Sequence, residues 1–180
     1  MALSLELAEK IFLSGFRPSI VVAILRGGYI VAKLVSDYLG IDEIATTEIK
    51  FYRGIGEKGE KPIISTPLIR SIKDEKVLIV DDVADSGRTL QVAIDLVRIY
   101  GAKEVKTATL YLKPWSITVP DYYVAETRSW IVFPWEVSEI LRELAKKLGG
   151  FEKAISILNL EKYYNKEIIE RIVKIAKHKA

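Results

Sequence analysis

The fold expected for this chain is decided by the stretch Val77-Leu78-Ile79-Val80-Asp81-Asp82-Val83-Ala84-Asp85-Ser86-Gly87-Arg88-Thr89-Leu90. Its first four residues are apolar and largely β-branched, which predicts a short strand that is buried on both faces. Two carboxylates stand where this strand ends, a turn of small residues follows, and the apolar spacing then becomes helical until Gly101. Open α/β sheets bind ligands beyond the carboxyl ends of such strands.

The turn over residues 84–89 carries groups that suit an anion such as phosphate. Its N–H groups from Ser86 to Thr89 begin a helix and therefore lack intrahelical acceptors. Two hydroxyls and the guanidinium of Arg88 add polar contacts and positive charge. Gly87 lets the backbone approach a ligand closely or adopt a positive φ.

Three carboxylates accompany this turn. Asp81 and Asp82 are consecutive in an extended segment, so they point to opposite sides and do not chelate one ion as a simple pair. One of them suits a ribose hydroxyl or a water-bridged Mg²⁺, and the other suits a second hydroxyl. Asp85 lies in the turn and is a candidate general acid or base. The plainer alternative is that Asp82 and Asp85 only cap the following helix.

The fourteen residues together resemble the signature with which type I phosphoribosyltransferases bind phosphoribosyl diphosphate (PRPP). That signature is an apolar run, two acids, two spacer residues and then Asp-Ser/Thr-Gly-x-Thr. The resemblance implies a three-layer α/β fold with a mainly parallel sheet. It implies that Asp81 and Asp82 hold the ribose 2- and 3-hydroxyls and a Mg²⁺ ion there, and that Asp85 is the catalytic acid or base. It also implies that the 5-phosphate is wrapped by Ala84, Asp85, Ser86, Gly87, Arg88 and Thr89.

Composition excludes several other kinds of site. The 180 residues are 49% hydrophobic and 28% charged, as in a globular domain, and the net charge of +3 is too small to suggest a nucleic-acid partner. Without cysteine there are no disulfides or thiolate metal sites, and the single histidine, His178, excludes a histidine cluster. No apolar run reaches the length of a membrane span, and residues 1–10 do not resemble a signal peptide. We therefore expect a cytoplasmic protein with no membrane partner, and the abundant Lys, Glu and Ile hint at a thermophile.

A second strand–loop–helix unit precedes the signature. A buried strand is predicted at Ile20–Leu25, and the loop after it, Arg26-Gly27-Gly28, leads into a helix that ends before Gly40. Two glycines and a guanidinium at the carboxyl end of a strand suit an oxyanion, although a plain turn is the simpler alternative. The family resemblance implies that Arg26 and Gly27 bind the diphosphate of PRPP and that an unusual, often cis, peptide bond lies near them.

The segment between the two units is predicted to contain a strand at 42–51, a charged glycine-rich loop at 52–62 and a return strand at 63–66. An ordinary hairpin is one interpretation of this loop. The resemblance gives another, a lid that closes over the active site and excludes water. Its candidates for diphosphate contact are Arg53, Lys58 and Lys61, with no basis for choosing among them.

The residues after the next predicted strand, 104–112, indicate which base the enzyme uses. Lys113 stands at the end of that strand, and two short strands are predicted at 121–126 and 129–133 before Pro134 opens a helix. A lysine, then an aromatic–aliphatic pair, then Pro-Trp-acid resembles the hood of the 6-oxopurine branch, the hypoxanthine and xanthine-guanine phosphoribosyltransferases.

In that branch, the resemblance implies that Lys113 donates to the purine O6, that Trp130 stacks on the ring, and that backbone groups of Ile131 read the purine edge. The resemblance also implies that Glu136 helps to bind metal or the 2-substituent, although the family more often has Asp there. An ammonium group only donates hydrogen bonds, so it favours a carbonyl over the amino group of adenine. The plainer interpretations are a solvated Lys113 and a core Trp130, and we expect Trp115 and Trp135 to be core residues.

The rest of the chain is predicted to be helical, at 137–148, 151–158 and 166–177. We expect a phosphoribosyltransferase core with its hood at 1–136, the hood lying mainly at 113–136, and a helical C-terminal extension at 137–180 within the same globule. The family resemblance does not extend to these helices, which either pack on the core or build a subunit interface.

The expected activity is purine salvage: transfer of the 5-phosphoribosyl group from PRPP to N9 of hypoxanthine, guanine or xanthine, with Mg²⁺ as cofactor and a dimer or tetramer as the assembly. Two alternatives remain open on sequence. One is the same reaction with adenine, orotate or uracil, and the other is a regulator that binds PRPP or a nucleotide without turnover.

Overall fold

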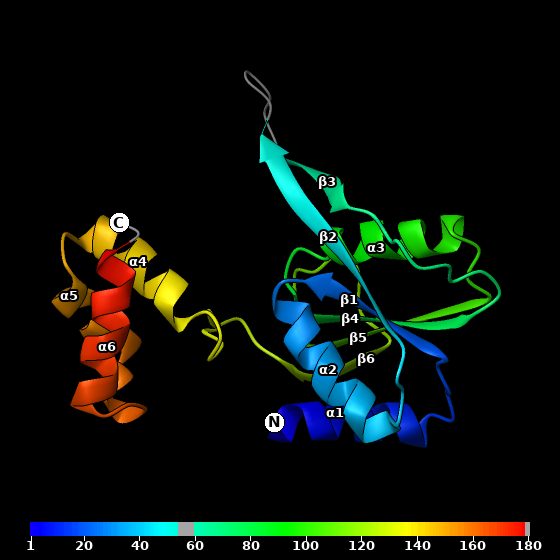
Figure 1. The fold of residues 1–180 in the computed structure, drawn as a ribbon, viewed down its shortest axis with the longest axis horizontal. Coiled ribbons are helices and arrows are strands. Elements are labelled where there is room, and N and C mark those ends of the chain that lie inside the picture. The colour runs from blue at the N-terminus through cyan, green and yellow to red at the C-terminus, as the bar shows by residue number, and fades with distance from the viewer. Residues whose placement is uncertain (54–59, 179–180) are drawn as a thin grey trace. The chain divides into compact units, whose positions relative to one another are not determined.

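The computed structural model describes residues 1–53 and 60–178, apart from the side chains of residues 52, 53, 60 and 61. The chain forms two compact units, residues 1–128 and residues 129–180 (Figure 1).

The first unit is built on one six-stranded sheet in the order β3-β2-β1-β4-β5-β6. Four neighbouring pairs, from β2 to β6, are parallel, and β3 pairs with β2 in the antiparallel direction. The mainly parallel sheet predicted from the sequence is therefore confirmed. The strands are β1 (Ile20–Leu25), β2 (Ile44–Arg53), β3 (Glu60–Thr66), β4 (Lys76–Ala84), β5 (Glu104–Leu112) and β6 (Tyr122–Glu126).

Helices cover both faces of this sheet and complete the three layers that were predicted. The helices α1 (Ala2–Leu13) and α2 (Gly27–Leu39) pack on each other and on one face, while α3 (Arg88–Ile99) packs on the other face (Figure 1). The central strands β1 and β4 are covered on both faces, which is why Ile20–Leu25 and Val77–Val80 are continuous apolar runs.

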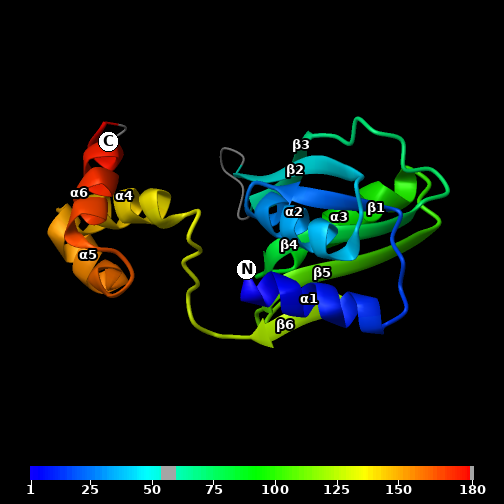
Figure 2. The same cartoon turned by 60° about the horizontal axis from the view of Figure 1, so that its bottom comes forward.

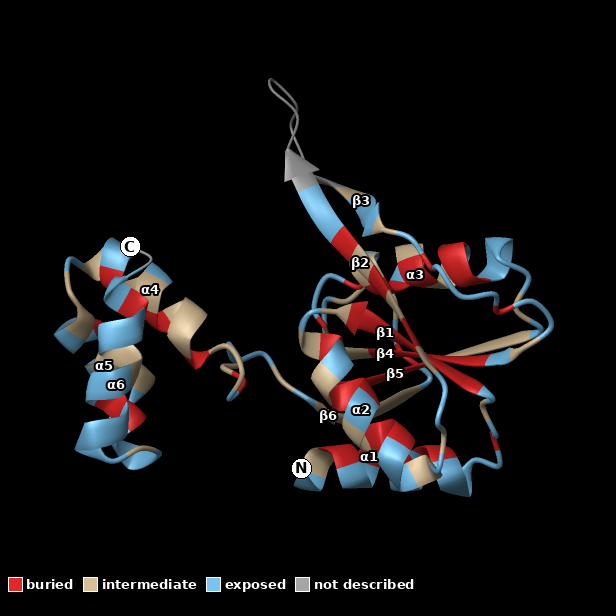
Figure 3. Cartoon of the chain, in the orientation of Figure 1, coloured by how far each residue is buried: buried red, intermediate tan, exposed pale blue. Residues whose placement is uncertain are grey.

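The hydrophobic core lies between the sheet and the helices that cover it. Val77 to Val80 of β4 are all 0% exposed. Alternate residues of β1 and β4, among them Val22 and Ile79, pack with Leu90 and Ala93 of α3. In Figure 3 the buried residues form a continuous band along β1, β4 and β5. The buried four-residue run predicted from the sequence is therefore the centre of the fold.

The signature strand is longer than predicted. We expected the carboxylates to mark its end, but β4 continues through Ala84, so that Asp81 and Asp82 belong to the strand. The reason is its neighbour: β5 runs beside it in register, with Asp81 opposite Thr109 and Ala84 opposite Leu112. Backbone pairing thus overrides the poor strand propensity of aspartate.

The antiparallel pair β2 and β3 forms the two arms of a hairpin, as one interpretation of this segment predicted. Both strands extend further toward the connection than we expected, with Arg53 opposite Glu60. The predicted lid falls on residues 54–59, outside the described residues. Lys58 and the side chains of Arg53 and Lys61 therefore keep their assignments as predictions.

The second unit is a small helical bundle (Figure 2). Its three α-helices have the predicted bounds, and their apolar faces enclose a core that includes Leu141, Ala154 and Ile169. The predicted strand at 129–133 is wrong, because this segment is irregular and pairs with no strand among the described residues. That the helices share one globule with the core stays a prediction. The helices are α4 (Val137–Leu148), α5 (Phe151–Leu158) and α6 (Lys166–Lys177), with a short 3₁₀ helix at Leu160–Lys162.

A polar cluster fastens the loop that leads into the edge strand β6. Asp121 Oδ2 accepts hydrogen bonds from the N–H and the hydroxyl of Thr107 at 2.9 and 2.8 Å, and Lys106 Nζ lies 2.8 Å from Oδ1. Partial burial raises the pKa of Asp121, but the hydrogen bonds from Lys106 and Thr107 outweigh it, and the pKa lies below its ordinary value of 3.8. The ionised carboxylate is thus the form that the fold prefers.

We predict that Asp121→Ala lowers the free energy of unfolding at pH 7 by about 1–3 kcal/mol, since it removes several hydrogen bonds to one charged group. Because the pKa of Asp121 is lower in the folded protein than in the unfolded chain, its ionised form stabilises the fold at any pH above the unfolded pKa. This stabilisation is lost as the pH falls through the pKa of the folded protein. The difference between variant and wild type should therefore shrink below about pH 4. Urea unfolding at pH 7 and pH 3 measures it, with Asp42→Ala at an exposed position as the control.

Candidate active site

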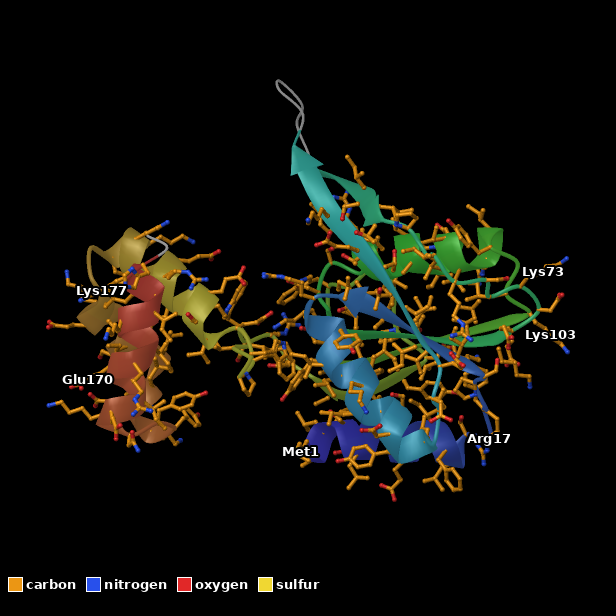
Figure 4. All side chains as sticks on the ribbon, viewed as in Figure 1. Met1, Arg17, Lys73, Lys103, Glu170 and Lys177 are labelled. Carbon is orange, nitrogen blue, oxygen red and sulfur yellow. The ribbon has the colours of Figure 1, made fainter. Side chains whose placement is uncertain are left out.

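The site lies where the carboxyl ends of three adjacent parallel strands meet. β1 ends at Leu25 before Arg26, β4 ends at Ala84 before Asp85, and β5 ends at Leu112 before Lys113. Because β4 pairs with both β1 and β5 in the parallel direction, the three loops that follow share one edge of the sheet. Lys73 and Lys103 project from the region of the opposite edge, where β4 and β5 begin (Figure 4).

The signature turn has the conformation that its glycine predicted. Gly87 has φ = +76° and is the N-cap residue of α3, so the first N–H groups of that helix begin directly after it. A Cβ atom at Gly87 would lie 2.5 Å from both Ser116 Oγ and the Thr118 backbone nitrogen. Position 87 therefore requires glycine for two reasons: the positive φ and the close approach of the 116–118 segment.

A hollow of about 180 Å³ lies within this turn. Small-ligand pockets usually measure ~300–1,000 Å³, so this hollow suits one group of a larger ligand, such as a phosphate. Phe51 of β2 contributes one wall. The remaining lining comes from the signature itself, from Asp81, Val83, Ala84, Asp85, Ser86, Gly87, Thr89 and Leu90.

The two strand carboxylates have different surroundings. Asp82 is 8% exposed, whereas Asp81 is more accessible and lines the hollow. Asp81 Oδ1 accepts a hydrogen bond from the backbone N–H of Asp82 at 2.9 Å. This bond holds the Asp81 carboxylate against the backbone of the next residue, and the prediction that the pair does not act as one chelate stays a prediction.

The Arg26-Gly27-Gly28 loop is fitted closely against β4. The peptide bond between Leu25 and Arg26 is cis, which confirms the unusual peptide bond expected near Arg26 and Gly27, and α2 begins at Gly27. A Cβ atom at Gly28 would lie 2.7 Å from the Val80 carbonyl oxygen, 2.8 Å from Asp81 Cα and 2.9 Å from Asp81 Oδ1. The second glycine therefore lets the start of α2 lie directly on the strand that carries the acidic pair.

Lys113 is not a solvated surface lysine, because only 5% of it is exposed. Its backbone N–H donates to the Ala84 carbonyl at 3.0 Å, which ties the end of β5 to the signature turn. Its ammonium nitrogen lies 5.7 Å from the centroid of the Trp115 ring, within the range of a cation–π contact. The predicted base-binding lysine thus belongs to the same edge of the sheet as the signature.

Trp115 is the residue that we assigned wrongly. We expected it in the core, but it is 52% exposed and its indole Nε1 donates to Asp85 Oδ1 at 2.9 Å. The sequence did carry a signal, which is the position of Trp115: a residue three places beyond the end of a buried parallel strand lies in the ligand crevice and not in the core.

The other hood residues belong to the second unit, and their roles stay predictions. Trp130 is 78% exposed, so the alternative of a core tryptophan is wrong. Ile131 lies in the irregular segment beside it, and Glu136 is the N-cap residue of α4. The ring of Trp135 stacks on Phe133 with centroids 4.8 Å apart, which agrees with its expected packing role.

Larger hollows, of about 640 and 600 Å³, lie between α5 and α6 of the helical unit. Their floor is apolar, with Ile155 and Ile169 common to both, and none of the predicted site residues lines them. Size alone would favour them as ligand sites. We place the active site at the smaller hollow because the anion-binding turn and the carboxylates converge there.

Comparison with known families identifies the family to which the chain belongs. The family model described as the phosphoribosyl transferase domain matches residues 2–141. The chain belongs to the phosphoribosyltransferase family. The match includes α1 and also the start of α4, although the family resemblance was expected to stop before the C-terminal helices.

Curated relatives carry names from the 6-oxopurine branch. The chain is 36% identical over 121 residues to the xanthine-guanine phosphoribosyltransferase of Cereibacter sphaeroides, covering 66% of this chain and 69% of that protein. It is 33% identical over 154 residues to the enzyme of the same name from Desulfotalea psychrophila, covering 84% of this chain and 86% of that one.

Solved structures with a similar fold carry names from the same family. A purine phosphoribosyltransferase from Pyrococcus horikoshii superposes with a TM-score of 0.69 at 47% identity, over 74% of this chain and 87% of that chain. The xanthine-guanine-hypoxanthine phosphoribosyltransferase of Helicobacter pylori gives a TM-score of 0.64 at 25% identity, over 79% and 89%. Among the residues that the structure describes, no helix is long and apolar enough to cross a membrane.

We predict that Gly28→Ala weakens PRPP binding at least tenfold and costs about 1–3 kcal/mol of stability, because its Cβ would overlap the backbone of β4. Calorimetric titration with PRPP and thermal unfolding measure the two effects. Gly150→Ala is the matched control, since nothing lies within 4 Å of its Cβ and its φ of 166° is extended. Unchanged PRPP affinity in Gly28→Ala would contradict the close fit.

Proposed function

We propose that this phosphoribosyltransferase transfers the 5-phosphoribosyl group of PRPP to N9 of a 6-oxopurine and releases diphosphate. The observation that carries the choice of base is Lys113. It is buried, it follows β5 at the site edge, and its backbone N–H is bonded to the signature turn at Ala84. The ammonium group is a donor only, so a ring carbonyl satisfies it and the amino group of adenine does not.

The proposed position of PRPP follows from the polar groups at the edge. Its 5-phosphate occupies the hollow and accepts hydrogen bonds from the N–H groups of residues 86–89 at the start of α3. Its ribose hydroxyls face Asp81 and Asp82. Its diphosphate lies toward Arg26 and Gly27, where the guanidinium offsets the negative charge that develops as the group departs.

Asp85 is the proposed catalytic acid or base. It lies in the signature turn, is exposed and lines the hollow. As N9 forms its bond to C1 of the ribose, the bond from C1 to the diphosphate oxygen breaks, and the N7 proton passes to the Asp85 carboxylate. Holding base and ribose in line lowers the entropic part of the barrier.

The residues at this edge fit Mg²⁺ as the cofactor. Among the described residues, no three of the His, Cys, Asp or Glu side chains gather into a metal site. Mg²⁺ keeps several waters and is commonly held by one or two carboxylates together with substrate phosphates, which is what Asp81 and Asp82 offer. When bound, it would neutralise the diphosphate.

The remaining base contacts in this proposal come from the family resemblance. Trp130 stacks on the purine, backbone groups of Ile131 read its edge, and Glu136 assists at the 2-substituent or the metal. A planar base gains ~1–3 kcal/mol from stacking on an aromatic ring, and the exposed Trp130 face is available for it. A dimer or tetramer, the cytoplasm and a thermophilic source stay predictions.

The relatives' names support the 6-oxopurine acceptor, since the curated relatives are named xanthine-guanine phosphoribosyltransferases and the Helicobacter pylori protein also names hypoxanthine. A screen with PRPP and Mg²⁺ against hypoxanthine, guanine, xanthine, adenine, orotate and uracil tests the proposal. Turnover of one or more 6-oxopurines without adenine is expected. Turnover of adenine alone would contradict the choice of base, and binding of PRPP without any turnover would favour a regulator.

We predict that Asp85→Asn lowers kcat by about 10²–10⁴-fold, the usual contribution of a general acid or base, while PRPP affinity stays within twofold of wild type. The amide keeps the size and polarity of the side chain but does not take up a proton at neutral pH. Initial rates together with calorimetric binding of PRPP separate the two effects. An unchanged kcat would remove Asp85 from the chemistry.

We predict that Lys113→Ala raises KM for 6-oxopurines and lowers kcat/KM at least tenfold, since the carbonyl loses a charged donor worth ~1.5–3 kcal/mol. Its effect on PRPP affinity should be small. Lys103→Ala, an exposed lysine where β5 begins, is the matched control and should retain wild-type kinetics. If Lys113→Ala also leaves kcat/KM unchanged, the lysine does not select the base.

A further inference from the structure

Trp115 contacts both of the residues that the proposed function assigns to the purine edge. Its indole Nε1 donates to Asp85 Oδ1 at 2.9 Å, and Lys113 Nζ lies 5.7 Å from the centroid of its ring. The side chain is 52% exposed, so the hydrophobic core does not account for its position. Its two charged partners at a ligand site therefore point to a polar role for its indole.

Backbone hydrogen bonds hold this contact from both sides. Lys113 N–H donates to the Ala84 carbonyl at 3.0 Å, and Ile117 N–H donates to the Ser86 carbonyl at 3.1 Å. The two acceptors are the chain neighbours of Asp85, and the two donors flank Trp115. The main chain therefore fixes the indole opposite the carboxylate, and the close approach at Gly87 keeps the two loops together.

The chemistry of a 6-oxopurine explains why such a link is useful. O6 and N7 lie on the same edge of the ring, so the group that donates to O6 and the group that exchanges the N7 proton must stand side by side. Lys113 and Asp85 are these groups in the proposed function. Both contact the same indole, which sets the spacing between them.

We propose that Trp115 is a positioning residue for the phosphoribosyl transfer. Its N–H holds Asp85 Oδ1 and leaves Oδ2 to take the N7 proton, and its ring supports the Lys113 ammonium beside it. Because an indole N–H only donates, Trp115 cannot compete for the transferred proton. The inference rests on the proposed function, since it concerns how the side chains of Asp85 and Lys113 are held within that site.

Kinetics of three variants test the role. Trp115→Phe keeps an aromatic ring and removes the donor, and we expect kcat for a 6-oxopurine to fall about 10- to 100-fold with PRPP affinity within twofold of wild type. Trp115→Gln restores a donor and should recover part of this loss. Val119→Ala, whose side chain is exposed further along the same segment, is the control and should leave kcat unchanged. A Phe variant with wild-type kcat would overturn the proposal.

A double-mutant cycle distinguishes positioning of Asp85 from stacking on the base. If Trp115 acts through the carboxylate, Trp115→Phe should cause little further loss of kcat in an Asp85→Asn background, because the proton acceptor is already gone. If the ring instead only stacks on the base, the two losses should multiply. Multiplying losses would therefore overturn the positioning role.

The hydrogen bond also has a readout that does not depend on turnover. In the ¹⁵N–¹H spectrum, the Trp115 indole resonance is identified by its absence in Trp115→Phe, and Asp85→Ala should shift it toward the position of a solvent-exposed indole. An indole resonance that Asp85→Ala leaves in place would overturn the inference. If the wild-type protein turned over no purine, the proposed function would fail while this spectrum still decided the contact.

Discussion

The parallel pairing of β4 with β1 on one side and β5 on the other is the constraint on which the site depends. Parallel neighbours end at the same edge of a sheet, so three loops that are distant in sequence meet there. The buried run Val77–Val80 makes this pairing stable, since it is covered by α2 on one face and α3 on the other. Burial of the apolar part of β4 therefore brings together the residues that are proposed to hold phosphate, ribose and base.

Within that edge, glycines permit the backbone contacts that bring the loops together. Gly28 lets α2 begin against Val80 and Asp81, and Gly87 lets the segment after β5 lie against the signature turn. The backbone hydrogen bonds from Lys113 and Ile117 then join these two loops. The signature turn and the segment that begins at Lys113 are therefore joined to each other through their backbones.

Sequence reasoning succeeded where local patterns decide structure. The bounds of β1 and β5 and of the three C-terminal helices agree with prediction, because each is an apolar pattern bounded by glycine, proline or polar residues. The predictions were wrong where a partner that is distant in the sequence determines the local structure. β4 continues through two aspartates because β5 pairs with it, and residues 129–133 form no strand because no strand pairs with them. Trp115 was misplaced because its contact with Asp85 spans 30 residues of sequence.

The most direct test of this account is a crystal structure of the protein with the 5′-monophosphate of a 6-oxopurine nucleoside. We expect the phosphate at the N–H groups of residues 86–89, N7 within hydrogen-bond distance of Asp85, and O6 facing Lys113. We also expect that the indole N–H of Trp115 remains hydrogen-bonded to Asp85. A nucleotide bound elsewhere, or with its base turned so that O6 and N7 face away from Lys113 and Asp85, would contradict it.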